Sequence, residues 1–120
     1  MERFETYQEE RPWGNFRQFT HNEVTTVKII SIKKGCSLSL QYHNHRIEFW
    51  KVLSGHPLVT IGEEKINAEP ENEFRVNNLQ IHQLEAPIDD VKVLEIAYGN
   101  FDENDIIRIK DKYGRVKKEN

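Results

Sequence analysis

Short runs rich in Val, Ile, Leu, Phe and Tyr alternate with turn-forming residues along almost the whole chain. No segment keeps apolar residues at the i, i+3, i+4, i+7 spacing of an amphipathic helix, so the pattern predicts an all-β domain. The even spacing of the turns favours a sandwich or a small barrel. The expected strands are Phe16–Phe19, Val24–Ile32, Leu38–Tyr42, Glu48–Ser54, Leu58–Ile61, Glu64–Ile66, Glu73–Val76, His82–Glu85, Val91–Tyr98 and Asp105–Ile109.

The length of the chain, 120 residues, fits about one average domain. No repeat or linker divides it, so we expect a single domain over residues 1–120, with residues 105–120 as a C-terminal extension. The formal net charge of −3 lacks the basic excess of nucleic-acid binders, so no nucleic-acid partner is expected. The apolar stretches are too short to span a membrane, so no membrane association is expected.

Two further features indicate a cytoplasmic protein. The N-terminal residues lack the apolar segment of a secretory signal. Cys36 is the single cysteine of the chain and cannot form an internal disulfide. We expect Cys36 to have a structural position in a strand or turn and not to act as a nucleophile, because no helix start or adjacent charge is present to activate its thiol.

The most informative residues are two histidines separated by one position, His43 and His45, followed by Glu48 and much later by His82. Residues two apart on a strand share a face, so Gln41, His43 and His45 would point the same way. Imidazoles and a carboxylate are the usual ligands of a divalent cation such as zinc. Glu48 breaks the alternation, so a turn or bulge must precede it.

A second interpretation of the same strand remains open. In it Leu38, Leu40 and Tyr42 face the core, and the alternate residues form a solvated polar face. A His-x-His pair is by itself a weak motif, and periodicity alone does not decide between the two. The additional presence of Glu48 and His82 favours the metal site.

Several separated motifs resemble one family. Gly35, His43, His45, Glu48 and Gly55 resemble the first cupin motif, and His82 stands at the histidine of the second. The match is closer still to the isomerase portion of type II mannose-6-phosphate isomerases. It is carried by Arg11–Gly14, by the Ser-Leu-Gln-x-His-x-His-Arg-x-Glu-x-Trp-x-Val run over Ser39–Val52, by Leu94–Ile96 and by the tail motifs within Asp105–Arg115.

The resemblance implies a cupin double-stranded β-helix, a jelly-roll-like small barrel with a metal just inside its mouth. It implies His43, His45, Glu48 and His82 as ligands of a divalent metal, with zinc as the expected ion. Gln41 is expected to contact the substrate and is a candidate supporting residue or substitute ligand, or else a surface amide. The family reaction interconverts mannose 6-phosphate and fructose 6-phosphate through an enediol, so the expected partner is a small sugar phosphate.

Roles in that reaction are assigned to four further residues. Arg46 is expected to contact the substrate and its phosphate, although an internal ion pair is the alternative. Glu95 is the first candidate for the general base and Lys51 the second. A surface or paired carboxylate on a strand is the alternative for Glu95. Lys51 is also expected to bind substrate, and Trp50 either packs or forms a wall of the sugar pocket.

Other residues of the resemblance are expected to be structural. Trp13 should seal one end of the barrel. Arg108 and Arg115 could either reach the phosphate or fix the tail by pairing with Asp105 or Asp111, and the structural role is favoured for both. The large nucleotide-binding domain of fused relatives has no counterpart here, and no Gly-rich loop joins a strand to a helix, so guanylyltransferase activity is not expected.

Two alternatives to the isomerase stay open. Asn77, Leu79 and Ala97 depart from the family pattern, which keeps a non-catalytic metal-binding cupin for a sugar or nucleotide sugar in view. Another cupin enzyme, such as an epimerase or a dioxygenase, is the third hypothesis, because a fold does not determine a function. If the polar face of the His-x-His strand looks inward, its apolar face must be covered by a second subunit or by the N-terminal segment. We predict a homodimer.

Overall fold

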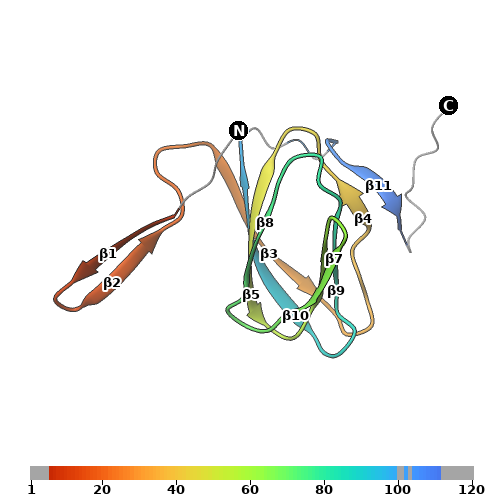
Figure 1. Cartoon of the computed structure of the whole chain (residues 1–120), viewed down its shortest axis with the longest axis horizontal. Helices are drawn as coiled ribbons and strands as arrows, with labels where there is room; N and C mark the ends of the chain where they lie inside the picture. The colour runs from red at the N-terminus through yellow and green to blue at the C-terminus, as the bar shows by residue number, and fades with distance from the viewer. Residues whose placement is uncertain (1–5, 100–101, 103, 112–120) are drawn as a thin grey trace.

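The computed structural model describes residues 6–99, 102 and 104–111, which form strands and no helix (Figure 1). The strands are β1 (Tyr7–Arg11), β2 (Gly14–Gln18), β3 (Thr25–Ile32), β4 (Leu40–Tyr42), β5 (Ile47–Ser54), β6 (Leu58–Ile61), β7 (Glu64–Asn67), β8 (Glu73–Val76), β9 (His82–Glu85), β10 (Val91–Tyr98) and β11 (Ile107–Lys110). The expected all-β fold is therefore confirmed for these residues. None of them belongs to a helix that could cross a membrane.

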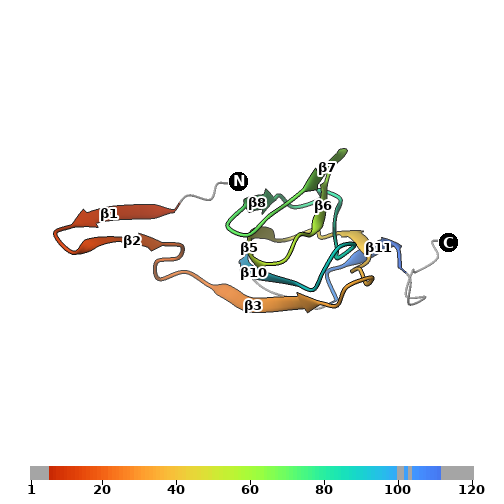
Figure 2. The same ribbon diagram turned by 90° about the horizontal axis from the view of Figure 1, so that it is seen from below.

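Two antiparallel sheets pack against each other to form a barrel (Figures 1 and 2). The strand order is β3-β10-β5-β8 in one sheet and β11-β4-β9-β6-β7 in the other. Neighbours in a sheet are often far apart in the sequence, since β10 lies between β3 and β5 and β4 lies between β9 and β11. This topology brings the last described strand beside the strand that precedes the histidine motif.

The alternation of side chains along the central strands fills the space between the sheets. Trp50 and Val52 on β5 and Val91 and Val93 on β10 point inward, and Leu84 on β9 meets them from the opposite sheet. Each of these side chains is at most 2% exposed. Burying one valine or leucine contributes roughly 1.5–3 kcal/mol, so this cluster holds the two sheets together.

Gly55 lies in the turn directly after β5. Its φ of +85° is in the left-handed region, and a Cβ atom on it would lie 2.1 Å from the backbone oxygen of Asp90. Both features require a residue without a side chain. The close approach lets the end of β5 pass beside the start of β10, which pairs with it.

A hairpin of β1 and β2 projects away from the barrel (Figures 1 and 2). The sequence pattern does not predict β1, because its residues are mostly polar and do not alternate. Trp13 lies in the turn of this hairpin and is 73% exposed, so its expected role as a seal of the barrel is wrong. Nη2 of Arg17 donates a 2.8 Å hydrogen bond to Oε1 of Glu73, which ties β2 to β8.

Strand β11 pairs with β4, with Arg108 opposite Gln41 and Ile107 opposite Tyr42. Part of the segment expected as a C-terminal extension thus contributes a strand to the five-stranded sheet. Arg115 lies outside the described residues.

The apolar row expected to face outward at Leu38, Leu40 and Tyr42 is found only in part. Leu38 lines a cavity between the two sheets, because β4 begins only at Leu40 and the alternation does not extend back to Leu38. Leu40 and Tyr42 are half-buried.

Candidate metal centre

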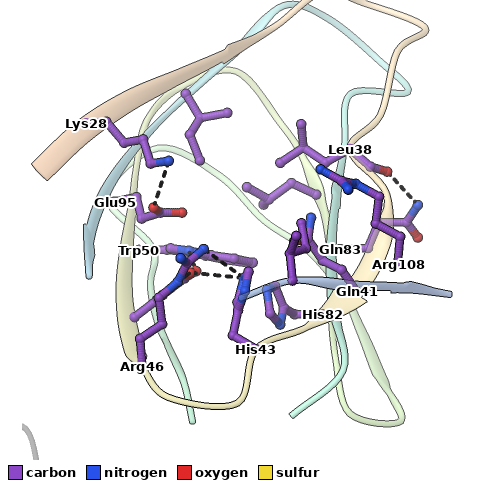
Figure 3. Close-up of a pocket in the computed structure, with 14 residues that line it drawn as sticks. Lys28, Leu38, Gln41, His43, Arg46, Trp50, His82, Gln83, Glu95 and Arg108 are labelled. Carbon is purple, nitrogen blue, oxygen red and sulfur yellow. Dashed lines mark hydrogen bonds and ion pairs between the residues drawn. The ribbon is translucent and has the colours of Figure 1, made fainter. Parts of the chain in front are cut away.

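A cavity of about 240 Å³ opens between the two sheets (Figure 3). Gln41, His43 and His82 reach it from β4, the following loop and β9, while Glu48 and Glu95 reach it from β5 and β10. Successive residues of a strand face opposite sides. The alternation that fills the core therefore also points two carboxylates into the cavity.

The imidazoles of His43 and His82 are held in the same way. Nδ1 of His43 lies 2.6 Å from the backbone oxygen of Asp105, and Nδ1 of His82 lies 2.8 Å from that of Gln80. A carbonyl oxygen only accepts, so each Nδ1 carries the proton and each Nε2 has a lone pair. Burial lowers the pKa of both histidines, which favours the neutral form that binds metals.

Glu48 completes a cluster of three potential ligands. One ligand atom from each of His43, Glu48 and His82 lies within 4.8 Å of the others, and all three residues are buried. Oε2 of Glu48 is 3.3 Å from Nε2 of His43. Burial alone would raise the pKa of Glu48, but the charged groups around it, including the guanidinium of Arg46 that donates to it, lower it, so the carboxylate is charged.

This donor set fits a divalent metal ion. Two imidazole lone pairs and a carboxylate are ligands that zinc and similar ions accept, and hydrogen bonds from Nδ1 to fixed acceptors are those that orient histidine ligands. Gln41 lines the same cavity and is the register partner of His82. It is therefore placed for either role considered from the sequence, supporting residue or substitute ligand, and it is not a surface amide.

Arg46 lies beside two of the three potential ligands. Its Nε donates a 2.8 Å hydrogen bond to Oε2 of Glu48, and its Nη2 lies 3.0 Å from Nε2 of His43. The internal ion pair considered for Arg46 from the sequence is therefore present. Because the lone pair of His43 serves one partner at a time, His43 would have to give up the hydrogen bond from Arg46 in order to hold a metal.

His45 does not join the cluster, contrary to the prediction from the sequence. Its side chain is exposed. Strand β4 ends at Tyr42, so the alternation that would align His45 with His43 does not apply in the loop that follows. Asp105 holds this loop instead, because its carboxylate accepts hydrogen bonds from the backbone N–H groups of Asn44 and His45, both at 2.9 Å.

Glu95, the predicted general base, lies in the wall of the cavity and is 5% exposed. Burial, and next the charge of Glu48, raise the pKa of Glu95 to about 7. Nζ of Lys28, its register partner on β3, lies 3.7 Å from its Oε2 (Figure 3). Sequence reasoning missed Lys28, because the register between β3 and β10 is needed to place it beside Glu95.

Trp50 lines the cavity, whereas its neighbour Lys51 does not. The indole Nε1 donates a 3.0 Å hydrogen bond to Oε1 of Glu48, and the ring meets His82 edge-on at 5.5 Å between centroids. Nζ of Lys51 lies 3.4 Å from Oε1 of Glu71, away from the cavity. Adjacent strand residues face opposite sides, so the expected roles of Lys51 as base and as substrate contact are wrong.

Arg108 reaches the cavity from β11 (Figure 3). The sequence favoured a structural pair with Asp105 or Asp111, but no ion pair joins Arg108 to a carboxylate among the residues that the structure describes. Its Nε is buried without a hydrogen-bond partner. The tail motif drew attention to Arg108, but the pairing of β11 with β4 is what directs it into the cavity.

Comparison with known proteins identifies the family. Residues 2–111 match the family described as "Mannose-6-phosphate isomerase C-terminal". The chain belongs to this family of mannose-6-phosphate isomerase C-terminal domains. Among its relatives, mannose-1-phosphate guanylyltransferase ManC of Salmonella typhimurium is 38% identical over 109 residues, covering 88% of this chain and 22% of the relative. Xanthan biosynthesis protein XanB of Xanthomonas campestris is 36% identical over 108 residues, covering 88% of this chain and 23% of XanB.

The domain thus spans less than a quarter of the length of these two relatives. Among solved structures, a cupin protein from Bacteroides fragilis superposes with a TM-score of 0.57 at 22% identity, covering 65% of this chain and 70% of that protein. The likeness establishes the cupin fold expected for a mannose-6-phosphate isomerase C-terminal domain.

Proposed function

We propose that this domain is a metal-dependent sugar-phosphate isomerase that interconverts mannose 6-phosphate and fructose 6-phosphate. One observation carries the proposal: a buried carboxylate that can exchange a proton near neutral pH, Glu95, lines the same cavity as the His43, Glu48 and His82 cluster. An aldose–ketose isomerase needs both a base and a means of stabilising negative charge on the sugar oxygens.

In this proposal His43, Glu48 and His82 hold a divalent ion, zinc being the ion we propose, and Gln41 supports them or adds a ligand. When bound, the ion supplies Lewis-acid polarisation of the sugar carbonyl. Trp50 fixes the orientation of Glu48 through its indole N–H and closes the wall beside His82.

Glu95 carries the proton between the two reacting carbons. Its carboxylate takes the proton from C2 of the open-chain aldose while the C1 carbonyl oxygen gains a proton, which gives the enediol. Return of the first proton to C1 and loss of the proton on the C2 oxygen give the ketose. A base with a pKa near the working pH suits both directions, and Lys28 stabilises the charged form of Glu95.

Arg46 already contacts Glu48 and His43, so at least part of its guanidinium must be released before it can contact the substrate. If His43 held a metal, Nη2 of Arg46 would lose its contact with His43, while Nε could keep its hydrogen bond to Glu48. The guanidinium can then approach the sugar oxygens beside the metal site. Arg46 thus links the ligand cluster to the substrate in this proposal.

A coupled assay with mannose 6-phosphate tests the proposal. Protein loaded with zinc, manganese, cobalt or nickel should form fructose 6-phosphate, and His43→Ala should abolish turnover while His45→Ala preserves it. Absence of turnover with every metal would replace the isomerase by the second candidate, a binding module for a sugar or nucleotide sugar. If Arg46 kept its contacts with His43 and Glu48 in the presence of metal, it could not contact the substrate. That result would favour the binding module.

A homodimer remains part of the proposal, supported by different residues from those expected. Val27 and Ile29 on β3 are each 57% exposed, and β3 is an edge strand. The neighbouring hairpin exposes Tyr7 and Trp13, and exposed apolar patches of this kind mark interaction surfaces. Sedimentation at micromolar concentration distinguishes monomer from dimer.

We also propose a cytoplasmic location, to which the free thiol of Cys36 is suited.

A further inference from the structure

The charges around the cavity do not balance among the described residues. Three cationic side chains line it, Lys28, Arg46 and Arg108, together with two carboxylates, Glu48 and Glu95. Arg46 is hydrogen-bonded to Glu48 at 2.8 Å, and Lys28 lies 3.7 Å from Glu95. Each carboxylate therefore has its own cation, and Arg108 is the remaining positive charge. A divalent ion at the ligand cluster would add further positive charge.

The acidic residue nearest to Arg108 along the preceding loop is already engaged. Both carboxylate oxygens of Asp105 accept hydrogen bonds from the loop after β4, Oδ1 from Asn44 and Oδ2 from His45. The Nε of Arg108 is buried and has no hydrogen-bond partner. A buried charged donor without an acceptor is unfavourable, so the site calls for an anionic ligand.

We propose that Arg108 binds the phosphate group of the substrate, an inference that rests on the proposed sugar-phosphate isomerase. A guanidinium presents a planar fork of N–H donors that matches two phosphate oxygens. Figure 3 shows Arg108 pointing into the cavity from a different wall than Arg46 and His43. An open-chain hexose 6-phosphate has its phosphate at the opposite end from the reacting C1 and C2. The ligand cluster and Arg108 thus receive the two ends of one molecule.

This assignment gives different roles to Arg46, which the sequence placed beside the substrate, and to Arg108, for which it favoured a structural role. Arg46 is committed to Glu48 at the ligand cluster, whereas Arg108 has no such partner among the described residues. Its position on β11, opposite Gln41, links recognition of the phosphate to the last described strand. Phosphate recognition therefore depends on the docking of β11 against β4.

Binding measurements test this inference without requiring turnover. We would titrate the metal-loaded protein with mannose 6-phosphate, with mannose and with inorganic phosphate by calorimetry. The variants are Arg108→Met, Arg108→Lys and, as a matched loss of charge from the same strand, Lys110→Met, whose side chain is exposed. The wild type should bind mannose 6-phosphate about 10- to 100-fold more tightly than mannose, the range expected for one charge-assisted contact.

Arg108→Met should remove this preference and leave mannose binding unchanged, while Lys110→Met should keep it. Arg108→Lys should restore part of the preference, because it retains the charge and loses the fork. Should Arg108→Met fail to fold, the comparison of Arg108→Lys with the wild type carries the test. An unchanged preference in both Arg108 variants, or none in the wild type, overturns the inference.

The outcome for Arg108 can be distinguished from that of the proposed function. If Arg108→Met loses the preference for phosphate but the wild type shows no turnover, Arg108 is a phosphate-binding residue and the protein is not an isomerase. If the wild type turns over mannose 6-phosphate and Arg108→Met has an unchanged KM, the protein is an isomerase but Arg108 does not bind the phosphate.

Discussion

The indole Nε1 of Trp50 donates a 3.0 Å hydrogen bond to Oε1 of Glu48, and both side chains are at most 2% exposed. The other carboxylate oxygen, Oε2, accepts a hydrogen bond from Arg46. Glu48 is therefore held at both oxygens before any metal arrives. Residues two apart on one strand share a face, which is why Trp50 can reach Glu48 at all.

Replacing Trp50 with Phe should lower the free energy of unfolding by about 1–3 kcal/mol, because one oxygen of a buried carboxylate loses its donor. It should also weaken metal binding. The matched change Trp13→Phe, on the exposed hairpin turn, should alter stability by less than about 0.5 kcal/mol. Urea unfolding of the two variants checks this, and equal destabilisation would contradict it.

The histidines should differ sharply in metal binding. His43→Ala and His82→Ala each remove a lone pair from the cluster and should reduce zinc affinity by more than the roughly 10- to 100-fold that loss of a supporting hydrogen bond costs. His45→Ala, on the exposed side of the same loop, should bind zinc as the wild type does. Elemental analysis after dialysis gives the stoichiometry, and a loss in His45→Ala would restore His45 as a ligand.

Glu95→Gln removes the proposed base and keeps the shape of the side chain. The kcat for mannose 6-phosphate should fall by about 10²- to 10⁴-fold, the usual contribution of a positioned acid or base, with metal content unchanged. Glu64→Gln, on exposed β7, is the control and should have the activity of the wild type. A metal-loaded Glu95→Gln variant with nearly full kcat would exclude Glu95 as the base.

Asp105 should stabilise the fold in a pH-dependent way. Burial would raise the pKa of Asp105, but hydrogen bonds from Asn44 and His45 together lower it. Its stabilising contribution is therefore complete above about 3.9, the ordinary value, and is lost as the pH falls through the lowered value. Asp105→Ala should have a lower Tm than the wild type at pH 7, and the difference should shrink on acidification. A difference independent of pH would rule out this role.

Gly55→Ala and Gly35→Ala separate backbone strain from steric conflict. Both glycines have positive φ, +85° and +86°, so each substitution should cost roughly 1–2 kcal/mol for the left-handed backbone. Only Gly55 has a backbone oxygen 2.1 Å from the added Cβ, whereas nothing lies within 4 Å at Gly35. Gly55→Ala should therefore cost about 4 kcal/mol or more, and chemical unfolding that gives equal values would contradict the close approach.

Strands with a buried face could be predicted from the sequence. The predicted Leu58–Ile61, Glu73–Val76, His82–Glu85 and Val91–Tyr98 agree at both ends with β6, β8, β9 and β10. Each of these strands has at least one buried apolar residue and is bounded by clear turn residues. Strand β1 was missed because it lies in a projecting hairpin, where no core imposes a pattern on its residues.

Most residues of the candidate site could be predicted from the sequence, but their positions could not. His43, Glu48, His82 and Glu95 all line the cavity. His45 was misplaced because the end of β4 depends on the loop held by Asp105, a residue about sixty positions away. Contacts of this kind follow from the pairing of distant strands, which local periodicity does not encode.

The pairing of distant strands also explains why the sequence analysis missed Lys28 and favoured a structural role for Arg108. Lys28 reaches it only because β3 pairs with β10, and Arg108 only because β11 pairs with β4. Neither residue stands near the histidine motif in the sequence. A single sequence thus indicates the metal ligands better than the charges that surround them.

The three potential ligands do not come from one layer of the barrel. His82 is on the five-stranded sheet and His43 follows its strand β4, whereas Glu48 is on the four-stranded sheet. An ion bound by all three would cross-link the two sheets. The Tm should therefore rise with the concentration of free metal. A chelator should lower the Tm, because the two sheets would then separate more readily.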